Sequence, residues 1–320
     1  MSMSLLRYTQ DGQILWGIIE NQRIVPLQLE ALSTAQLLRH DLDSLRRLRL
    51  PEQTRDLPAP SQQLSPISAP CKILCQGANY RQHAQESGLT QDQPFNLFFT
   101  KSSAAIHTPS GYIQAPPFVR LLDYEIELAL VLKKDTSGTQ DIRPENLHEY
   151  VGGICIANDV SARDIQIRQG QFHKAKSYRT FCPLGPVLCL LEPQEMAYLS
   201  RLQLTLSVNG QIRQEAHTSG LIHDPVATLS EFSQICDFSA GDVLLTGTPA
   251  GCALRVPSET IQRCVSWLSA ARRWQLFMAL QSHRPYLRAG DQISSCIVSD
   301  DGEIHLGTQQ HEVVFLPEAQ

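Results

Sequence analysis

The stretch "LLDYEIELALVL", residues 121–132, decides the fold that we expect, because it combines a buried character with regularly spaced acids. Leucine, isoleucine, valine and alanine dominate it, which predicts a strand inside the protein. Asp123, Glu125 and Glu127 occupy alternate positions, so an extended backbone places all three on one face. Two glutamates at positions i and i+2 lie roughly 7 Å apart at Cα, and their carboxylates are able to converge on one point.

Two interpretations of these acids remain open from this stretch alone. One is a solvent-facing edge strand, on which charge discourages pairing with another strand. The other is a cation site. Carboxylates that converge in an apolar setting repel each other and take up protons unless a positive charge lies among them.

A second segment, "YVGGICIANDVSARD" at residues 150–164, supplies a further acid. Its apolar part predicts a strand that ends at Asp159. Ser161 and Asp164 have the spacing of a capping box, which predicts a helix beginning near Ala162. Together with the two glutamates, Asp159 would form an oxygen-only trio that suits a hard cation, and Mg²⁺ fits best. A simple helix cap is the alternative role for Asp159.

The segment "FHKAKSYRTFCPLGP", residues 172–186, adds two basic candidates, Lys174 and Lys176. Its prolines and glycine predict a loop. A lysine near the acids would stabilise developing negative charge or bind a substrate carboxylate. An ordinary solvated surface lysine is the alternative for either one.

Two further segments carry chemistry. In "GANYRQHAQESG", residues 77–88, His83 and Glu86 share a face if the segment forms a helical turn. A histidine oriented by a carboxylate is a competent general base for water, whereas a surface pair is the alternative. In "LLTGTPAG", residues 244–251, glycines flank a Thr-Pro, which predicts a tight turn whose backbone N–H groups are able to hold an anion. This segment lacks the P-loop pattern.

Length, charge and cysteine content exclude several classes of protein. The 320 residues allow one large domain, with or without a small appendage. A formal net charge of −5 argues against a nucleic-acid partner. No run of about 18 apolar residues is present, so we expect neither export nor a membrane partner. The nine cysteines are scattered without a CxxC pair, which indicates reduced thiols in the cytoplasm.

The N-terminal part reads as a separate small unit. Residues 5–27 predict a β-meander and residues 30–48 a helical segment. Residues 51–70 contain five prolines and few apolar residues, which indicates a linker. We therefore expect a small α+β domain at 1–65 and a main domain at 70–320.

The main part is rich in short β segments and poor in helices. Strands are predicted at 71–77, 124–132, 150–159, 185–191, 201–215 and 242–249. Helices are predicted after Ser161, at 227–235 and at 258–281. This order has no regular alternation of strand and helix, so the expected class is β-dominated α+β.

Four of these motifs resemble the signatures of the fumarylacetoacetate hydrolase family. They are "LDYEIELALVL", "ANDVSARDIQ", "KAKSYRTFCPLGP" and "LLTGTPAG", in the family's order and at similar spacing. In addition, "NYRQHAQE" followed by "LFFTKSSAAI" resembles the family's lid segment and its next strand. The match covers about residues 72–251. It implies a mixed β-sandwich roll and a homodimer, similar to bacterial acylpyruvate hydrolases and hydroxyheptadienedioate isomerases.

The resemblance also implies roles for single residues. Its metal ligands for Mg²⁺ or Mn²⁺ match Glu125, Glu127 and Asp159, and its water-activating pair matches His83 and Glu86. Its substrate-side residues match Lys101, Gln166, Lys176 and Thr248, of which Lys176 also has a catalytic role. One departure is Ser102, where the family's segment after the lysine usually has proline.

A second departure follows the "TGTPAG" turn. Members of the family pass quickly from this turn to a Gly-Asp pair, but here 38 residues, 252–289, come before Gly290. Residues 255–288 of this insert predict one or two helices that carry six arginines and a single acid, Glu259. A lid wall, a dimer contact, a partner surface and a solvated helix without a chemical role all remain open.

The expected activity is divalent-metal-dependent hydrolysis of a C–C bond in a β-diketo acid similar to an acylpyruvate, giving pyruvate and a carboxylic acid. The alternative is an isomerase or decarboxylase that acts through a metal-stabilised enolate on hydroxymuconate-type diacids or oxaloacetate. A non-catalytic protein that binds a partner through the basic insert is a third possibility. The complete set of candidate ligands argues against it.

Overall fold

The acid-rich stretch forms two strands at the centre of the protein. The computed structural model describes residues 2–29, 33–86, 95–257 and 263–318. Within 121–132, β10 (Leu122–Asp123) and β11 (Ile126–Leu132) are separated by a break at Tyr124 and Glu125. β11 pairs with β12 (Val151–Asn158) on one side and with β18 (Val243–Leu245) on the other. The interpretation as a solvent-facing edge strand is therefore wrong.

The large sheet has eleven strands and runs through both halves of the chain. Its order is β4-β3-β2-β1-β15-β12-β11-β18-β6-β7, and β5 pairs beside β1. The strands not yet placed are β1 (Met3–Gln10), β2 (Gln13–Glu20), β3 (Arg23–Pro26), β4 (Arg55–Asp56), β5 (Gln63–Leu64), β6 (Ile73–Gly77), β7 (Leu97–Lys101) and β15 (Val187–Leu190).

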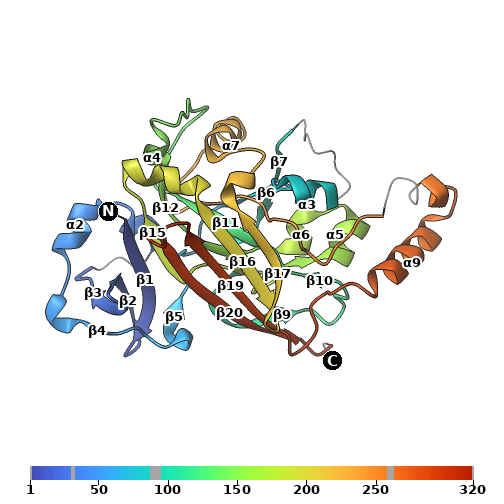
Figure 1. Cartoon of the computed structure of the whole chain (residues 1–320), viewed down its shortest axis with the longest axis horizontal. Coiled ribbons are helices and arrows are strands. Elements are labelled where there is room, and N and C mark those ends of the chain that lie inside the picture. The colour runs from blue at the N-terminus through green and yellow to red at the C-terminus, as the bar shows by residue number, and fades with distance from the viewer. Residues whose placement is uncertain (1, 30–32, 87–94, 258–262, 319–320) are drawn as a thin grey trace.

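A second sheet of five strands packs against the first (Figure 1). Its order is β17 (Gln211–His217), β16 (Leu202–Val208), β19 (Gln292–Ser299), β20 (His305–Phe315) and β9 (Ser110–Ala115). Two short pairs complete the β structure: β10 with β13 (Ser161–Ala162), and β8 (Ile106–His107) with β14 (Cys182–Pro183). The expected strand-dominated class is confirmed.

The alternation of residues along β11 explains how the two faces of the large sheet are covered. Ile126, Leu128 and Leu130 pack into the core between the two sheets. Ala129 and Val131, on the opposite face, belong to a second apolar cluster that includes residues of the N-terminal part. β11 is therefore covered on both faces, as its apolar composition requires.

The N-terminal part contains the expected meander, but its later elements differ from the prediction. The segment expected to be one helix at 30–48 forms α1 (Thr34–Leu37) and α2 (Leu42–Arg47), because the Asp41 side chain accepts a bond from Ser44 N–H and begins a new helix. Residues 30–32 lie outside the described residues. The expected linker contributes β4 and β5 to the large sheet, and β1 pairs with β15. The division into domains near residue 65 remains a prediction.

Short helices gather at one end of the sheets (Figure 1). They are α3 (Arg81–Glu86), α5 (Arg163–Gln169) and α6 (Phe172–Lys176). The expected capping box of α5 is wrong. Ala162 is the N-cap residue and has no side-chain bond, while the Ser161 hydroxyl donates to the carbonyl of Asp159.

The remaining helices lie elsewhere on the molecule. They are α4 (Leu147–Tyr150), α7 (Pro225–Phe232) and α9 (Ala270–Gln281), with 3₁₀ turns at η1 (Pro51–Gln53), η2 (Pro60–Gln62), η3 (Ser103–Ala105), η4 (Pro193–Ser200) and η5 (Thr218–Gly220). α9 belongs to the predicted insert and extends away from the sheets (Figure 1). Residues 258–262, where that helical prediction began, lie outside the described residues. No described helix is long and apolar enough to cross a membrane.

Candidate active site

Three buried carboxylates come together where β11 and β12 meet. Glu127 lies in β11, Glu125 lies at the break before it, and Asp159 follows the end of β12. The Asp159 N–H donates to the Glu125 carbonyl at 2.8 Å, which fixes the two segments side by side. Oxygen atoms of the three carboxylates lie within 4.8 Å of one another. The structure therefore brings together the trio that the sequence indicated.

Three buried cations surround this trio. Lys176 Nζ lies 2.5 Å from carboxylate oxygens of both Glu125 and Asp159. Lys101 pairs with the other oxygen of Asp159 and donates to the carbonyl of Phe181 at 2.7 Å. Arg163 pairs with Glu125, so two of the three acids are held by basic side chains.

Glu127 has no basic partner among the described ion pairs. It accepts a bond from the Gly247 N–H at 2.7 Å. Burial, together with the nearby charges of Asp159 and Glu125, raises its pKa well above the ordinary value. Burial also acts to raise the pKa of Glu125, but Arg163 and Lys176 outweigh burial and hold that pKa low. Glu127 is therefore the acid of the trio that no basic side chain offsets, and it holds a proton unless a cation binds beside it.

A hard divalent cation would replace that proton, and the oxygen-only donors fit such a cation. Glu125, Glu127 and Asp159 would hold Mg²⁺ or Mn²⁺, as the sequence predicted. The "TGTPAG" turn assists by directing a backbone N–H at Glu127, so the anion that this turn holds is a carboxylate of the chain itself. Gly247 has φ +89°, and a Cβ there would meet Asn79 Cβ at 2.8 Å, which explains the glycine.

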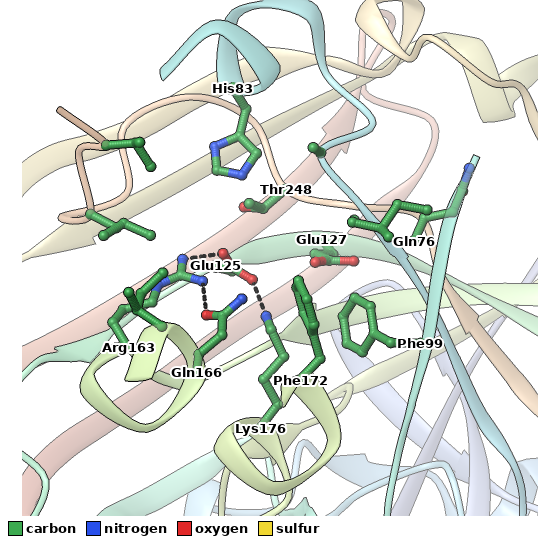
Figure 2. Close-up of a pocket in the computed structure, with 16 residues that line it drawn as sticks. Gln76, His83, Phe99, Glu125, Glu127, Arg163, Gln166, Phe172, Lys176 and Thr248 are labelled. Atoms are coloured by element: carbon green, nitrogen blue, oxygen red, sulfur yellow. Dashed lines mark hydrogen bonds and ion pairs between the residues drawn. The ribbon is translucent and has the colours of Figure 1, made fainter. Parts of the chain in front are cut away.

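A cavity of about 240 Å³ opens beside the trio. Its polar side carries Glu125, Glu127 and Lys176, while His83 lies across from Lys176 (Figure 2). The rest of its wall is largely apolar and includes Leu97, Phe99, Ile167, Phe172, Leu254 and Val256. The site is able to bind a small molecule whose anionic end faces Lys176 and whose other end faces the apolar wall.

His83 and Glu86 both lie in α3, as their spacing indicated. Burial lowers the pKa of His83 to about 4, although Glu125 acts to raise it, so the imidazole is neutral at pH 7. Glu86 accepts from the Gly251 N–H at 3.1 Å and pairs with Arg255. Its described contacts thus anchor the segment after the turn. Its role in orienting His83 remains a prediction.

The predicted substrate-side residues occupy different places. Gln166 lines the cavity and accepts a bond from Arg163 at 2.8 Å. Thr248 also lines it, and its hydroxyl donates to the Ile126 carbonyl at 2.9 Å. Lys101 lies behind Asp159 and is not part of the cavity wall. Lys174 is exposed, so Lys176 is the lysine of that segment that reaches the acids.

Sequence reasoning missed Arg163, which is the partner of Asp123. Asp123 accepts from Arg163 Nε at 2.8 Å and from the N–H groups of Ala253 at 2.8 Å and Leu254 at 3.1 Å. It therefore connects the strand junction to the segment that follows the turn. Because Asp123 shares a face with Glu125, the sequence indicated a buried acid that requires a cationic partner. The sequence did not indicate that Arg163 is this partner.

Cys252 was also missed. Its buried sulfur lies 3.9 Å from His83 Nδ1 and 3.8 Å from Glu125 Oε1. The thiol follows a turn whose motif gives no signal for sulfur at this position.

Fold and site together define a β-rich enzyme class with a candidate metal site, in which acids, basic side chains and a histidine surround a small cavity. The family described as fumarylacetoacetate (FAA) hydrolase C-terminal matches residues 72–314. The chain therefore belongs to the fumarylacetoacetate hydrolase family, as the motifs indicated.

Named relatives show the range of reactions in this family. The chain is 39% identical over 190 residues to oxaloacetate tautomerase YisK from Bacillus subtilis, an alignment that covers 58% of this chain and 62% of that protein. Its fold is similar to fumarylacetoacetate hydrolase from Exiguobacterium antarcticum, with TM-score 0.74, 27% identity, and coverage of 98% and 100%. The fold is also similar to 5-carboxymethyl-2-hydroxymuconate delta-isomerase from Mycobacterium smegmatis, with TM-score 0.69, 25% identity and the same coverage.

Proposed function

We propose that this protein is a divalent-metal-dependent tautomerase or isomerase, which moves a proton within a 2-oxo acid through an enolate. The observation that carries the proposal is the neutral imidazole of His83 opposite Lys176, across a cavity that Glu125 and Glu127 of the trio line. A relative named oxaloacetate tautomerase and a structural neighbour named hydroxymuconate isomerase support the same chemistry. This is the alternative of the sequence analysis, and these comparisons favour it over C–C hydrolysis.

Each residue has a defined task in this proposal. Mg²⁺ or Mn²⁺, when bound by Glu125, Glu127 and Asp159, supplies positive charge for the enolate and carboxylate oxygens. His83 accepts a proton at a ring nitrogen from the carbon next to the keto group and returns it to the product. Lys176, already beside two carboxylates, faces the same anionic end and offsets its charge.

The other predicted residues position these groups. Lys101 holds one oxygen of Asp159 from behind, while the other oxygen of Asp159 faces Lys176. Gln166 and Thr248 border the cavity and would orient the substrate by hydrogen bonds. The rings of Phe99 and Phe172 exclude water from the apolar side, which strengthens the charge interactions within the site.

The test is proton exchange on a defined substrate. Oxaloacetate and a hydroxymuconate-type diacid are supplied separately, with Mg²⁺, Mn²⁺ or EDTA, and the enol absorbance and product mass are followed. We expect metal-dependent interconversion that falls about 10²- to 10⁴-fold in His83→Ala. Lys174→Ala is the matched control for Lys176→Ala, because Lys174 is exposed and should leave the rate unchanged. Full activity in EDTA would contradict the proposal.

Hydrolysis of an acylpyruvate-like β-diketo acid is the second candidate. The apolar wall formed by Leu97, Phe99 and Phe172 favours it, because this wall suits an acyl chain better than a second carboxylate. Here His83, with Glu86, would activate water, and pyruvate and a carboxylic acid would be released. Mass analysis of products from an acylpyruvate panel separates cleavage from isomerisation. The homodimer implied by the resemblance is tested in the same preparation by light scattering.

A further inference from the structure

A second group of potential metal ligands lies beside the carboxylate trio. It consists of His83 from α3, Glu125 from the strand junction and Cys252 from the segment after the turn. Only two groups of this kind occur in the part of the chain that the structure describes, and they share Glu125. All three side chains of the second group are buried, although they come from segments far apart in the sequence.

The two distances from the sulfur in this group are close to those of a tetrahedral zinc site. Zinc–sulfur bonds of about 2.3 Å and zinc–nitrogen or zinc–oxygen bonds of about 2.0–2.2 Å place the ligand atoms about 3.6 Å apart at a tetrahedral angle. Cys252 Sγ lies 3.9 Å from His83 Nδ1 and 3.8 Å from Glu125 Oε1. Movements of a few tenths of an ångström would bring the sulfur into range of both partners.

The donor types separate this group from the trio. Sulfur, nitrogen and one carboxylate suit zinc, whereas Mg²⁺ takes oxygen donors only. His83 and Glu125 both line the cavity, so a cation held by them and the thiolate would have its fourth position open to it. When Glu125 turns one oxygen toward such a cation, Arg163 keeps its bond to Asp123 at 2.8 Å.

We propose that His83, Glu125 and Cys252 form a second metal site, selective for zinc, next to the Mg²⁺ or Mn²⁺ site. Binding replaces the Cys252 thiol proton, which leaves to solvent, with a sulfur–zinc bond. The bound ion occupies the His83 ring nitrogen and a Glu125 oxygen. Zinc therefore inhibits the reaction proposed above. The inhibition rests on that proposed function, but the binding itself does not.

The direct test needs no variant. Full-length protein is stripped of metal, saturated with Mg²⁺ to fill the trio, and given one equivalent of Zn²⁺. X-ray absorption at the zinc edge should show one sulfur neighbour at about 2.3 Å. A zinc environment of nitrogen and oxygen alone would overturn the proposal, because it would place the ion on the carboxylates or the surface.

Variants then identify the sulfur. Co²⁺ replaces Zn²⁺ as a probe, since a thiolate–cobalt bond gives an absorption band that oxygen ligands do not. We expect the band in wild type and in Cys264→Ser, whose cysteine is exposed, and its loss in Cys252→Ala and Cys252→Ser. Competition with a chelator should show zinc affinity reduced at least about 10-fold in both Cys252 variants. Circular dichroism verifies folding, and a band that persists in folded Cys252→Ser overturns the assignment.

Measurements of activity distinguish a failure of the proposed zinc site from a failure of the proposed tautomerase function. If tautomerase activity is present, micromolar Zn²⁺ should inhibit wild type and Cys264→Ser, and inhibit Cys252→Ser at least about 10-fold less strongly. If no activity is found but zinc binds with one sulfur ligand, the proposed function fails and the zinc site stands. If activity is present and zinc has no sulfur ligand, the proposed zinc site fails and the proposed function stands.

Discussion

Arg163 is the single residue on which the charge balance of the site most depends. It is buried and pairs with two buried acids, Asp123 and Glu125. In Arg163→Ala both carboxylates lose this partner inside the protein. We expect the free energy of unfolding, measured in urea without added metal, to fall by about 3–5 kcal/mol. The proposed tautomerase activity should fall with it, because Glu125 then keeps Lys176 as its one basic partner among the described ion pairs.

Arg143 supplies the matched control for this prediction. It pairs with Asp141, but both side chains are more than half exposed, at 66% and 71%. Arg143→Ala should therefore leave stability almost unchanged. Equal losses in the two variants would contradict the importance that we give to the buried pair.

His311 makes the stability of the protein depend on pH at a place remote from the cavity. Its Nε2 donates to the Thr108 carbonyl at 2.9 Å, and burial lowers its pKa from 6.5 to about 4. Because the folded value lies below the unfolded one, the unfolded state gains a proton first as pH falls. Stability that is complete above pH 6.5 is lost progressively toward pH 4.

This contribution is measurable with one substitution. His311→Gln keeps an N–H donor but does not titrate. From pH 7 to pH 5 the wild type should lose about 2 kcal/mol more stability than the variant, measured by urea unfolding. His305→Gln is the control, because His305 is exposed and should keep the wild-type slope. Parallel curves for His311→Gln and wild type would contradict the expectation.

At the same scale, the residues that were predictable are those that a repeating pattern or a family motif marks. Alternation places Glu125 and Glu127 on one face, and the resemblance selects Asp159 as the third ligand. Arg163 was not predictable, because its pairing with Asp123 joins positions 40 residues apart and depends on a tertiary contact. Cys252 belongs to the same group, since only the folded chain brings it to His83.

At the scale of elements, α9 is attached to the body of the protein through its last turn. Gln281 is buried, donates to the Arg255 carbonyl at 2.8 Å, and accepts from the Tyr286 hydroxyl at 2.8 Å. Phe277 and Met278 pack against a small apolar cluster, whose members are Leu121, Ala253 and Tyr286. The remaining surface of the helix is largely exposed, and one further contact is made by Arg168, which lies over the Trp274 ring at 5.7 Å.

Gln281→Leu tests this attachment. The change leaves the buried Tyr286 hydroxyl without its acceptor, at a cost of about 1–3 kcal/mol in local stability. Trypsin should then cut after Arg272 or Arg273 about 10-fold faster under native conditions, with fragments identified by mass. Gln275→Leu, at an exposed position of the same helix, should leave the cleavage rate unchanged. Equal rates in both variants would show that other contacts hold α9.

The predicted ends of strands were wrong where side chains, and not a neighbouring strand, accept the backbone N–H groups. The sequence predicted one strand across 121–132, but the structure breaks it at Tyr124 and Glu125. There the Glu125 N–H donates to the Asn158 side chain at 3.0 Å, and the Ile126 N–H donates to the Gln214 side chain at 3.0 Å. Such long-range contacts interrupt a strand that the local pattern favours, and they turn Glu125 toward the site.

For the molecule as a whole, the sequence predicted the strand-dominated class but could not show how far the large sheet extends. Strand pairing joins β1 to β15, with Leu5 opposite Leu188. The apolar cluster on that side contains Met3, Leu5 and Trp16 together with Leu188 and Leu190. Pairing between distant strands leaves no local signal, so a proline-rich segment such as 51–70 resembles a linker even when it adds strands to a sheet.

This shared sheet predicts the outcome of cutting the chain at the expected boundary. A fragment of residues 70–320 would expose the edge of β15 and the apolar side chains that β1 and β2 cover, at roughly 25 cal/mol for each Å² of apolar surface. We expect it to aggregate or to lack a cooperative thermal transition by circular dichroism, whereas the full chain unfolds cooperatively. Mixing it with a separate 1–69 peptide should partly restore solubility. A fragment that is monomeric, cooperatively folded and fully active would show instead that residues 1–65 are an independent domain.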